Sequence, residues 1–220
     1  MYYWISEIVT LGGMIIALII GRKAWATSKR ALFPKLIADG LGCMALGCLH
    51  DTVYLLVTGT YAHDINIGHL GVIGCFLFLI SASYGQLDRI FDDRSKENKK
   101  YRLLAFLAPV AMLIVFIPSL LTDSLSPMLK VSEFLGWLPM IFASYFNFKH
   151  AIFPDGGFVF VKAVRPYNIA AVIFGFTEVV YMTMYTLEKP VLVVVCAAVL
   201  AVSACAMMYF AKRGAEKWTI

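Results

Sequence analysis

Four carboxylates lie inside long apolar stretches of the chain: Glu7, Asp51, Glu133 and Glu178. An ionisable side chain inside a bilayer is costly, and it is by default a hypothesis for a functional site. Glu7 and Glu133 occupy similar strings, Ile-Ser-Glu and Val-Ser-Glu. Glu133 follows Glu7 by 126 residues (133 − 7), and Glu178 follows Asp51 by 127 residues (178 − 51). These near-equal offsets indicate one site that is built twice by a repeated folding unit.

A tyrosine accompanies one acid of each copy. Tyr54 follows Asp51 by three residues, and Tyr181 follows Glu178 by three residues. Residues three apart share one face of a helix. The common spacing therefore predicts a tyrosine–carboxylate hydrogen bond in each copy.

Four carboxylates gathered in one site require a positive species to balance their charge. Two like charges 4 Å apart repel by about 4 kcal/mol even at an effective dielectric constant of 20. We expect no buried Lys or Arg beside these acids, because the basic residues fall in predicted loops. Protons, a metal ion or a cationic ligand must then balance the charge. The predicted binding residues are Glu7, His50, Asp51, Tyr54, His69, Glu133, Glu178 and Tyr181.

A metal site is one alternative, because His and carboxylate side chains are the ligands of metal centres in helical bundles. The Glu-x-x-His spacing of those centres is absent, since the third residue after the acid is tyrosine in both copies. A haem held by His50 and His69 would need an apolar slot, and the neighbouring acids argue against it. No cofactor is required by the sequence. The candidate metal ligands are Glu7, Asp51, His69, Glu133 and Glu178.

The elements that position these residues are predicted to be membrane-spanning helices. The chain is 60% hydrophobic and 15% charged, whereas soluble domains are about 25% charged. A helix needs roughly 20 apolar residues to cross the hydrocarbon of the bilayer. The fold class is therefore an all-α, polytopic membrane protein. Seven stretches qualify as spans: 4–21, 36–58, 67–86, 103–121, 129–148, 166–187 and 190–211.

The basic residues predict the orientation of these spans. Of the 19 Lys and Arg residues, 17 fall in stretches on one side of the predicted bundle: 22–35, 89–102, 149–165 and 212–217. Only Lys130 and Lys189 fall on the other side. The positive-inside rule then places the N-terminus outside and the C-terminus in the cytoplasm of a plasma (inner) membrane. A nucleic-acid partner is excluded, because no soluble module carries a basic face. The polar stretch from Leu87 to Arg102 is expected to be a solvated loop.

The offsets between the acids predict a parallel internal repeat within one transmembrane domain, residues 1–220. Repeat one covers 1–89, a linker helix covers 102–122 and repeat two covers 128–213. A single linker helix lets both three-helix copies share one orientation, which the distribution of basic residues also requires. Parallel repeats are a known construction of transporters, and their binding sites lie near the repeat interface.

Seven helices with an external N-terminus in a three-one-three arrangement resemble the transporter–opsin–receptor superfamily. That resemblance covers the whole chain and implies a carrier or a receptor. The proline-glutamine-loop carriers are one group of this superfamily, and the resemblance to them implies a Pro-Gln pair in the first and fifth spans. This chain has no such pair in either span, although Pro139 lies near the expected place in the fifth. The seventh span also has no lysine between Lys189 and Lys212, so retinal has no attachment point there.

These features favour a carrier for a cation or a small amine-bearing solute, in which protons on the carboxylates could couple to transport. One alternative is a seven-helix sensor with an outward-facing pocket and a separate signalling partner. Another is an intramembrane metal-dependent enzyme. Enzyme activity is the less favoured reading, because no Ser-His-Asp, HExxH or glycine-rich nucleotide motif occurs. A homo-oligomer within the lipid bilayer is compatible with the sequence.

Overall fold

The computed structural model describes residues 2–27, 32–59, 66–88, 92, 95–122, 127–154 and 159–218, and all regular structure in these ranges is helical. Helices suit an apolar chain, because they satisfy every interior backbone hydrogen bond within one segment. Pro127 and Pro190 are first residues of helices, where the missing proline N–H is not needed. The elements are α1 (Tyr2–Thr27), α2 (Leu32–Thr58), α3 (Ile67–Ile80), η1 (Ser81–Asp88), α5 (Lys99–Leu104), α6 (Leu107–Leu121), α7 (Pro127–Ile152), α8 (Val159–Thr186) and α9 (Pro190–Trp218).

Six helical segments in the described ranges are long and apolar enough to cross a membrane. They are Tyr2–Arg22, Leu32–Thr58, Ile67–Gly85, Lys99–Leu121, Val161–Thr186 and Pro190–Lys217. This finding supports a membrane protein made of helices. The seventh span, the orientation and the repeat stay predictions.

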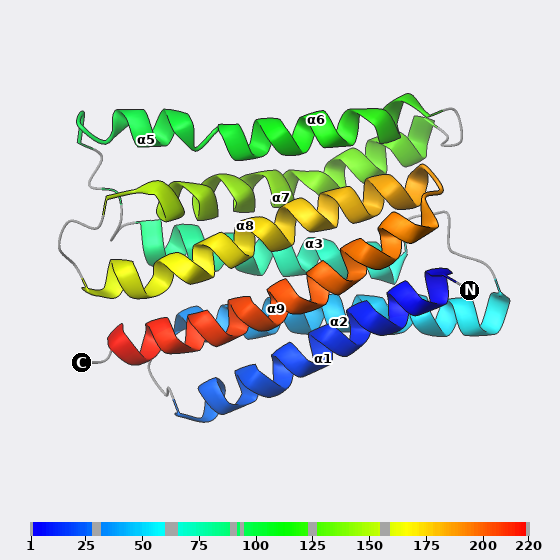
Figure 1. Cartoon of the computed structure of the whole chain (residues 1–220), viewed down its shortest axis with the longest axis horizontal. Coiled ribbons are helices and arrows are strands. Elements are labelled where there is room, and N and C mark those ends of the chain that lie inside the picture. The colour runs from blue at the N-terminus through cyan, green and yellow to red at the C-terminus, as the bar shows by residue number, and fades with distance from the viewer. Residues whose placement is uncertain are drawn as a thin grey trace.

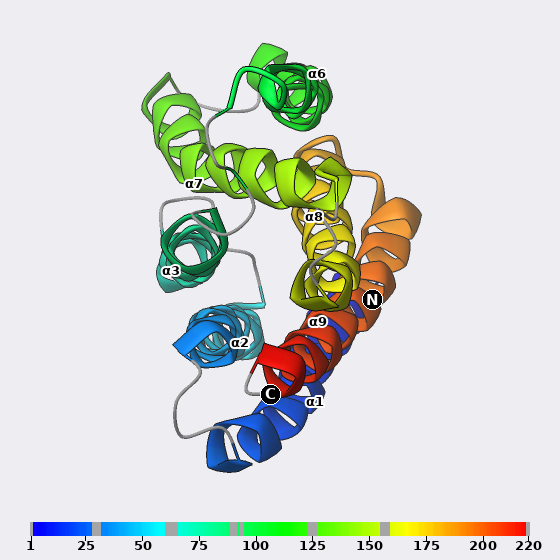
Figure 2. The ribbon, with the colours of Figure 1, turned by 90° about the vertical axis from the view of Figure 1, so that its left-hand side faces the viewer.

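The helices lie side by side with their long axes roughly aligned (Figure 1). Helix α9 packs against α1 and α8, while α3 packs against α2 and α7. Figure 2 shows α6 at one edge of the bundle and α1 at the opposite edge. Helices α5 and α6 occupy the predicted linker, 102–122, and a turn at Ala105 and Phe106 separates them.

Glycines let α2 and α3 approach closely. A Cβ atom added to Gly47 would lie 2.9 Å from the carbonyl oxygen of Gly68 and 3.2 Å from the Cα of Gly71. Small residues at such crossings let two backbones meet within a membrane. The close crossing also brings the end of α2 that carries Asp51 against the start of α3.

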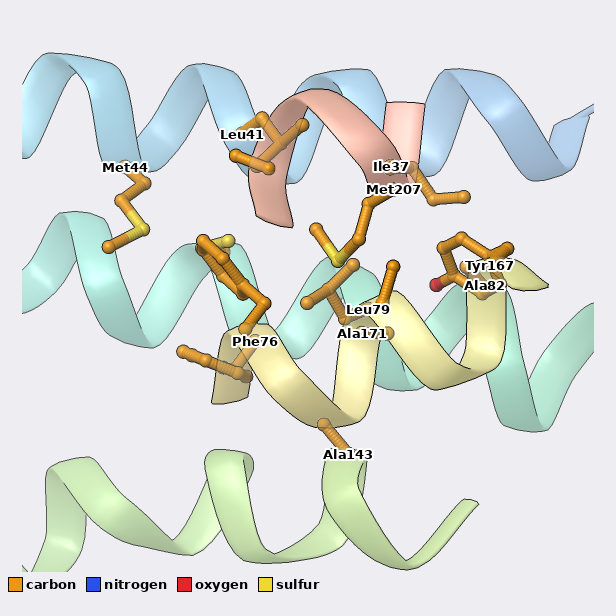
Figure 3. Close-up of a cluster of buried hydrophobic side chains, with 14 of the residues drawn as sticks. Ile37, Leu41, Met44, Phe76, Leu79, Ala82, Ala143, Tyr167, Ala171 and Met207 are labelled. Atoms are coloured by element: carbon orange, nitrogen blue, oxygen red, sulfur yellow. The ribbon is translucent and has the colours of Figure 1, made fainter. Parts of the chain in front are cut away.

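An apolar layer fills the middle of the bundle (Figure 3). Its side chains come from five helices and are almost fully buried. Phe76 of α3 stacks on Phe174 of α8 with ring centroids 5.8 Å apart, and such pairs add about 0.5–1.5 kcal/mol beyond their buried area. Other members are Ile37, Leu41, Met44, Leu79, Ala143, Ala171 and Met207.

Two expectations about charged residues were wrong. Lys149 lies within α7 and its side chain is only 3% exposed, although the sequence placed it in a loop. Asp92 is also buried, with 4% of its side chain exposed, within the stretch that we expected to be solvated. Ion pairing explains both differences, because Lys149 pairs with Asp88 and Asp92. A basic residue next to a predicted loop can thus be buried when acids from another segment meet it.

Candidate functional site

The acidic end of the bundle holds Glu7 of α1, Asp51 of α2 and Glu178 of α8. Its best-defined contact joins α1 to α8, where the Tyr181 hydroxyl donates a hydrogen bond to Oε1 of Glu7 across 3.0 Å. The rings of Tyr3 and Tyr185 also meet, with centroids 5.1 Å apart. These two contacts hold the first turns of α1 against the last turns of α8.

Glu178 is the most buried of the three described acids, with 3% of the residue exposed. Its Oε2 atom is buried and has no hydrogen-bond partner among the described residues. The charged group that acts on it most strongly is the carboxylate of Glu7, which is itself only 8% exposed. A buried carboxylate beside a like charge lacks the compensation that burial normally demands.

Asp51 has a different environment, although the repeat made it equivalent to Glu178. Its Oδ1 atom accepts a hydrogen bond from Nδ2 of Asn66 at 3.0 Å and contacts Nδ1 of His50 at 3.2 Å. Its side chain is 28% exposed. A Cβ atom at Gly68 would collide with this carboxylate, so the glycine leaves room for it. Asp51 is therefore a paired and partly exposed acid, whereas Glu178 is buried.

Asn66 is a site residue that the sequence analysis missed. Its side-chain oxygen accepts a hydrogen bond from the backbone N–H of His69 at 3.0 Å, which caps the N-terminus of α3. The same oxygen lies 3.0 Å from Nδ1 of His69. An asparagine just before an apolar run is a recognised N-cap signal, so this residue could have been found. Asn66 thereby fixes His69 and Asp51 relative to the start of α3.

The three described acids converge around Cys48 of α2. Glu7, Asp51 and Glu178 all act electrostatically on its thiol. Asp51 also acts on Glu7. The structure therefore brings three of the four predicted carboxylates to one end of the bundle. Glu133 lies in α7, and its side chain falls outside the described residues.

The two predicted tyrosines do not play matching roles. Tyr181 bonds to Glu7 on another helix and not to Glu178, three residues before it. The ring of Tyr54 stacks on His50, with centroids 6.2 Å apart and planes 27° apart. Because neighbouring helices offer partners that the spacing cannot reveal, the i, i+3 relation did not predict the acceptor of Tyr181.

No group of three or more His, Cys, Asp or Glu side chains among the described residues is arranged to hold a metal ion. The metal alternative named Glu7, Asp51, His69, Glu133 and Glu178, and of these the side chain of Glu133 lies outside the described set.

The apolar layer forms the floor of the acidic end. Phe174 lies one turn before Glu178 on the same face of α8, and its ring stacks on Phe76. Beyond this layer, Ser83 of η1 donates a hydrogen bond to Asn147 of α7 across 2.9 Å. The acidic end is thus separated from the far end by aromatic rings and then by a buried polar contact.

No protein family, curated protein or solved structure matches this chain.

Proposed function

We propose that this protein is a membrane carrier for a cation or a small amine-bearing solute. The observation that carries the proposal is Glu178, a carboxylate 3% exposed with one oxygen unpartnered among the described residues. Its strongest charged neighbour is another acid, Glu7. Several kcal/mol are lost when an ion is buried without a counter-charge. A group retained at such a cost has a use, and binding a positive species is the use that its chemistry supports.

The surroundings of Glu178 define what it would bind. Glu7 is already engaged by Tyr181, and Asp51 by Asn66 and His50. Of the three described acids, Glu178 is therefore the one with an open coordination position. The ammonium group of a small amine can donate up to three hydrogen bonds, and the Phe76–Phe174 stack would face its carbon atoms. Protonation of the same carboxylates would compete with the solute and so couple transport to protons.

The topology proposed for this carrier is seven spans in a three-one-three arrangement, with the acidic end facing outward. The positive-inside rule supports this orientation, because the basic stretches lie at the other end of the helices. The resemblance to the transporter–opsin–receptor superfamily is part of the same proposal. Partial exposure of His50 and Asp51, at 31% and 28% of their side chains, suits residues at an entrance.

The test is charge movement in proteoliposomes adsorbed to a solid-supported membrane. Concentration jumps of ethylammonium, choline and potassium ions are applied to wild-type protein, Glu178→Gln and the control Glu97→Gln. Glu97 is exposed in a turn outside the site. We expect at least one probe to give currents that fall about tenfold or more in Glu178→Gln, as expected for loss of a charged contact worth over 1.4 kcal/mol. Currents that are unchanged in Glu178→Gln would overturn the proposal, and saturable binding without flux would favour the sensor.

A further inference from the structure

The end of the bundle opposite the acidic end carries a buried group of ion pairs. Lys149 of α7 pairs with Oδ1 of Asp88 and, at 3.3 Å, with Oδ2 of Asp92. Arg102 of α5 donates to Oδ1 of Asp92 at 2.7 Å and to the carbonyl oxygen of Ser95 at 2.7 Å. We call this group the ion-pair end. It was not visible in the sequence, because Lys149 lies 57 positions after Asp92, one of the acids that it meets.

Aromatic rings complete the surroundings of the Lys149 ammonium group. Its Nζ atom lies 5.9 Å from the ring centroid of Tyr145, 5.4 Å from that of Phe146 and 5.9 Å from that of Phe153. A cation within about 6 Å of a ring face is attracted by the ring quadrupole. Two carboxylates and three rings are thus the chemistry by which proteins recognise an ammonium ion.

The described acids of the ion-pair end are matched by described bases. Burial lowers the pKa of His150, which favours the neutral ring, and its Nε2 atom lies 3.1 Å from Oδ1 of Asp88. Burial acts to raise the pKa of Asp88, but hydrogen bonds from His150 and Lys149 outweigh burial and lower it. Among the described residues, two carboxylates therefore face two cations, Lys149 and Arg102. Removal of the Lys149 ammonium would leave Asp88 with the neutral His150 ring, and no cation, among its described partners.

The ion pairs connect separate parts of the chain. Asp88 ends η1, which continues α3, while Arg102 belongs to α5 and Lys149 to α7. The hydrogen bond between Ser83 and Asn147 lies just inside this group, between η1 and α7. Any opening between α3 and α7 at this end must separate Lys149 from Asp88.

We propose that Asp88, Asp92 and the three rings form a second ammonium site, which Lys149 fills as a tethered ligand that holds this end of the bundle closed. The natural competitor of such a ligand is a small primary alkylammonium ion, which presents the same group. The inference goes beyond transport at the acidic end and does not depend on it.

The reporter for opening is Ser83→Cys, because Ser83 is fully buried behind the ion pairs. Purified protein in nanodiscs is labelled with a hydrophilic maleimide. The labelling rate of the parent chain, which carries only the five native cysteines, is subtracted as background. In this background we expect Lys149→Ala to accelerate labelling about tenfold or more, since breaking a buried pair is strongly unfavourable. Lys162→Ala is the control, because Lys162 is exposed at the start of α8 and should leave the rate unchanged.

Ethylammonium then tests the chemistry of the site. We expect it to restore protection in Lys149→Ala, whereas tetraethylammonium, which has no N–H groups and is larger, should not. Asp92→Asn is a second variant that preserves side-chain shape, and we expect it to accelerate labelling as well. The proposal is overturned if folded Lys149→Ala and Asp92→Asn, each combined with Ser83→Cys, label no faster than Ser83→Cys alone. It is also overturned if ethylammonium does not slow the labelling of Lys149→Ala. Labelling requires no transport, so this result is independent of Glu178→Gln.

Discussion

The hydroxyl of Tyr181 in α8 donates a hydrogen bond to the carboxylate of Glu7 in α1, and 174 residues of chain separate the two. The contact leaves Glu178, on the same helix as Tyr181, with a buried oxygen that has no partner among the described residues. Glu7 and Glu178 act on one another electrostatically, but they differ in their hydrogen bonding. Glu7 is held by the Tyr181 hydroxyl, whereas Oε2 of Glu178 has no partner among the described residues.

Tyr181→Phe should destabilise the protein by about 1–3 kcal/mol, because the hydrogen bond to Glu7 is lost and its acceptor oxygen stays buried. The measurement is the free energy of unfolding in mixed micelles of increasing SDS fraction. Tyr54→Phe is the matched control, because the structure gives the Tyr54 ring a stacking contact with His50 that the substitution preserves. Equal losses in the two variants would contradict the special role of the Tyr181 hydroxyl.

Glu178→Leu should have the opposite effect and raise the free energy of unfolding by about 1–3 kcal/mol, because an apolar side chain replaces a buried carboxyl group that has an unpartnered oxygen. The same variant should abolish the response to cationic probes. Residues kept for function at a cost in stability show this pattern. If Glu178→Leu unfolds more easily than wild type in SDS titration, the carboxylate has a structural partner and the proposed role is wrong.

Much of the helical fold could be predicted from apolar length alone. The stretch 36–58 became α2 (Leu32–Thr58), and 190–211 became α9 (Pro190–Trp218). Helix α2 begins before its apolar stretch and α9 continues after it, because a helix keeps its own backbone hydrogen bonds outside the bilayer as well as inside it. Hydropathy therefore located these helices better than their ends.

The site was predicted less completely, for reasons of pairing. Intramembrane acids are rare enough that Glu7, Asp51 and Glu178 could be chosen by type, and the structure brings them together around Cys48. The partner of each acid could not be chosen, because partners come from other helices. Lys149 illustrates the same limit, since its acid Asp92 lies 57 residues away. Local spacing carries no information about such contacts.

Gly71→Ala should destabilise the crossing of α2 and α3 by about 1–3 kcal/mol, which is the usual cost of overpacking. The new Cβ atom would lie 2.7 Å from the carbonyl oxygen of Cys43 and 2.8 Å from the Cα of Gly47, so a backbone must move. Gly12→Ala is the control, because no heavy atom lies within 4 Å of its Cβ position. SDS titration should show no loss for Gly12→Ala, and a comparable loss in both variants would contradict the close crossing.

Asn66 can be divided into two roles by a pair of substitutions. Asn66→Asp keeps an oxygen for the N–H of His69 and loses the donor to Asp51, whereas Asn66→Ala loses both contacts. Loss of a cap costs about 1 kcal/mol, so only Asn66→Ala should weaken the start of α3. Amide hydrogen exchange over the first turn of α3 measures this difference. Both variants should alter the binding of cationic probes such as ethylammonium, because each one removes the hydrogen bond that Asn66 donates to Asp51. If amide exchange over the first turn of α3 were accelerated equally in Asn66→Asp and Asn66→Ala, loss of the cap would not be the cause of the faster exchange.

The stability of the ion-pair end should fall with acidification. His150 lies beyond the predicted span 129–148, and burial lowers its pKa below the ordinary value of 6.5; Asp88 and Asp92 oppose this shift and Lys149 adds to it. Below pH 6.5 the unfolded chain therefore binds a proton that the folded chain does not, and the free energy of unfolding decreases as pH falls. The pKa of Asp88 is lowered from 3.8, which gives a further loss of the same sign in stronger acid.

His150→Gln isolates the first of these two losses. The slope of unfolding free energy against pH approaches about 1.4 kcal/mol per pH unit for one proton, and the variant should lose that part of the slope just below pH 6.5. The loss due to Asp88 at lower pH should persist in the variant. SDS titration of wild type and variant from pH 7.5 downward measures the difference, in which the other titrating groups cancel. Parallel curves for the two proteins would show that His150 titrates alike in the folded and unfolded chain.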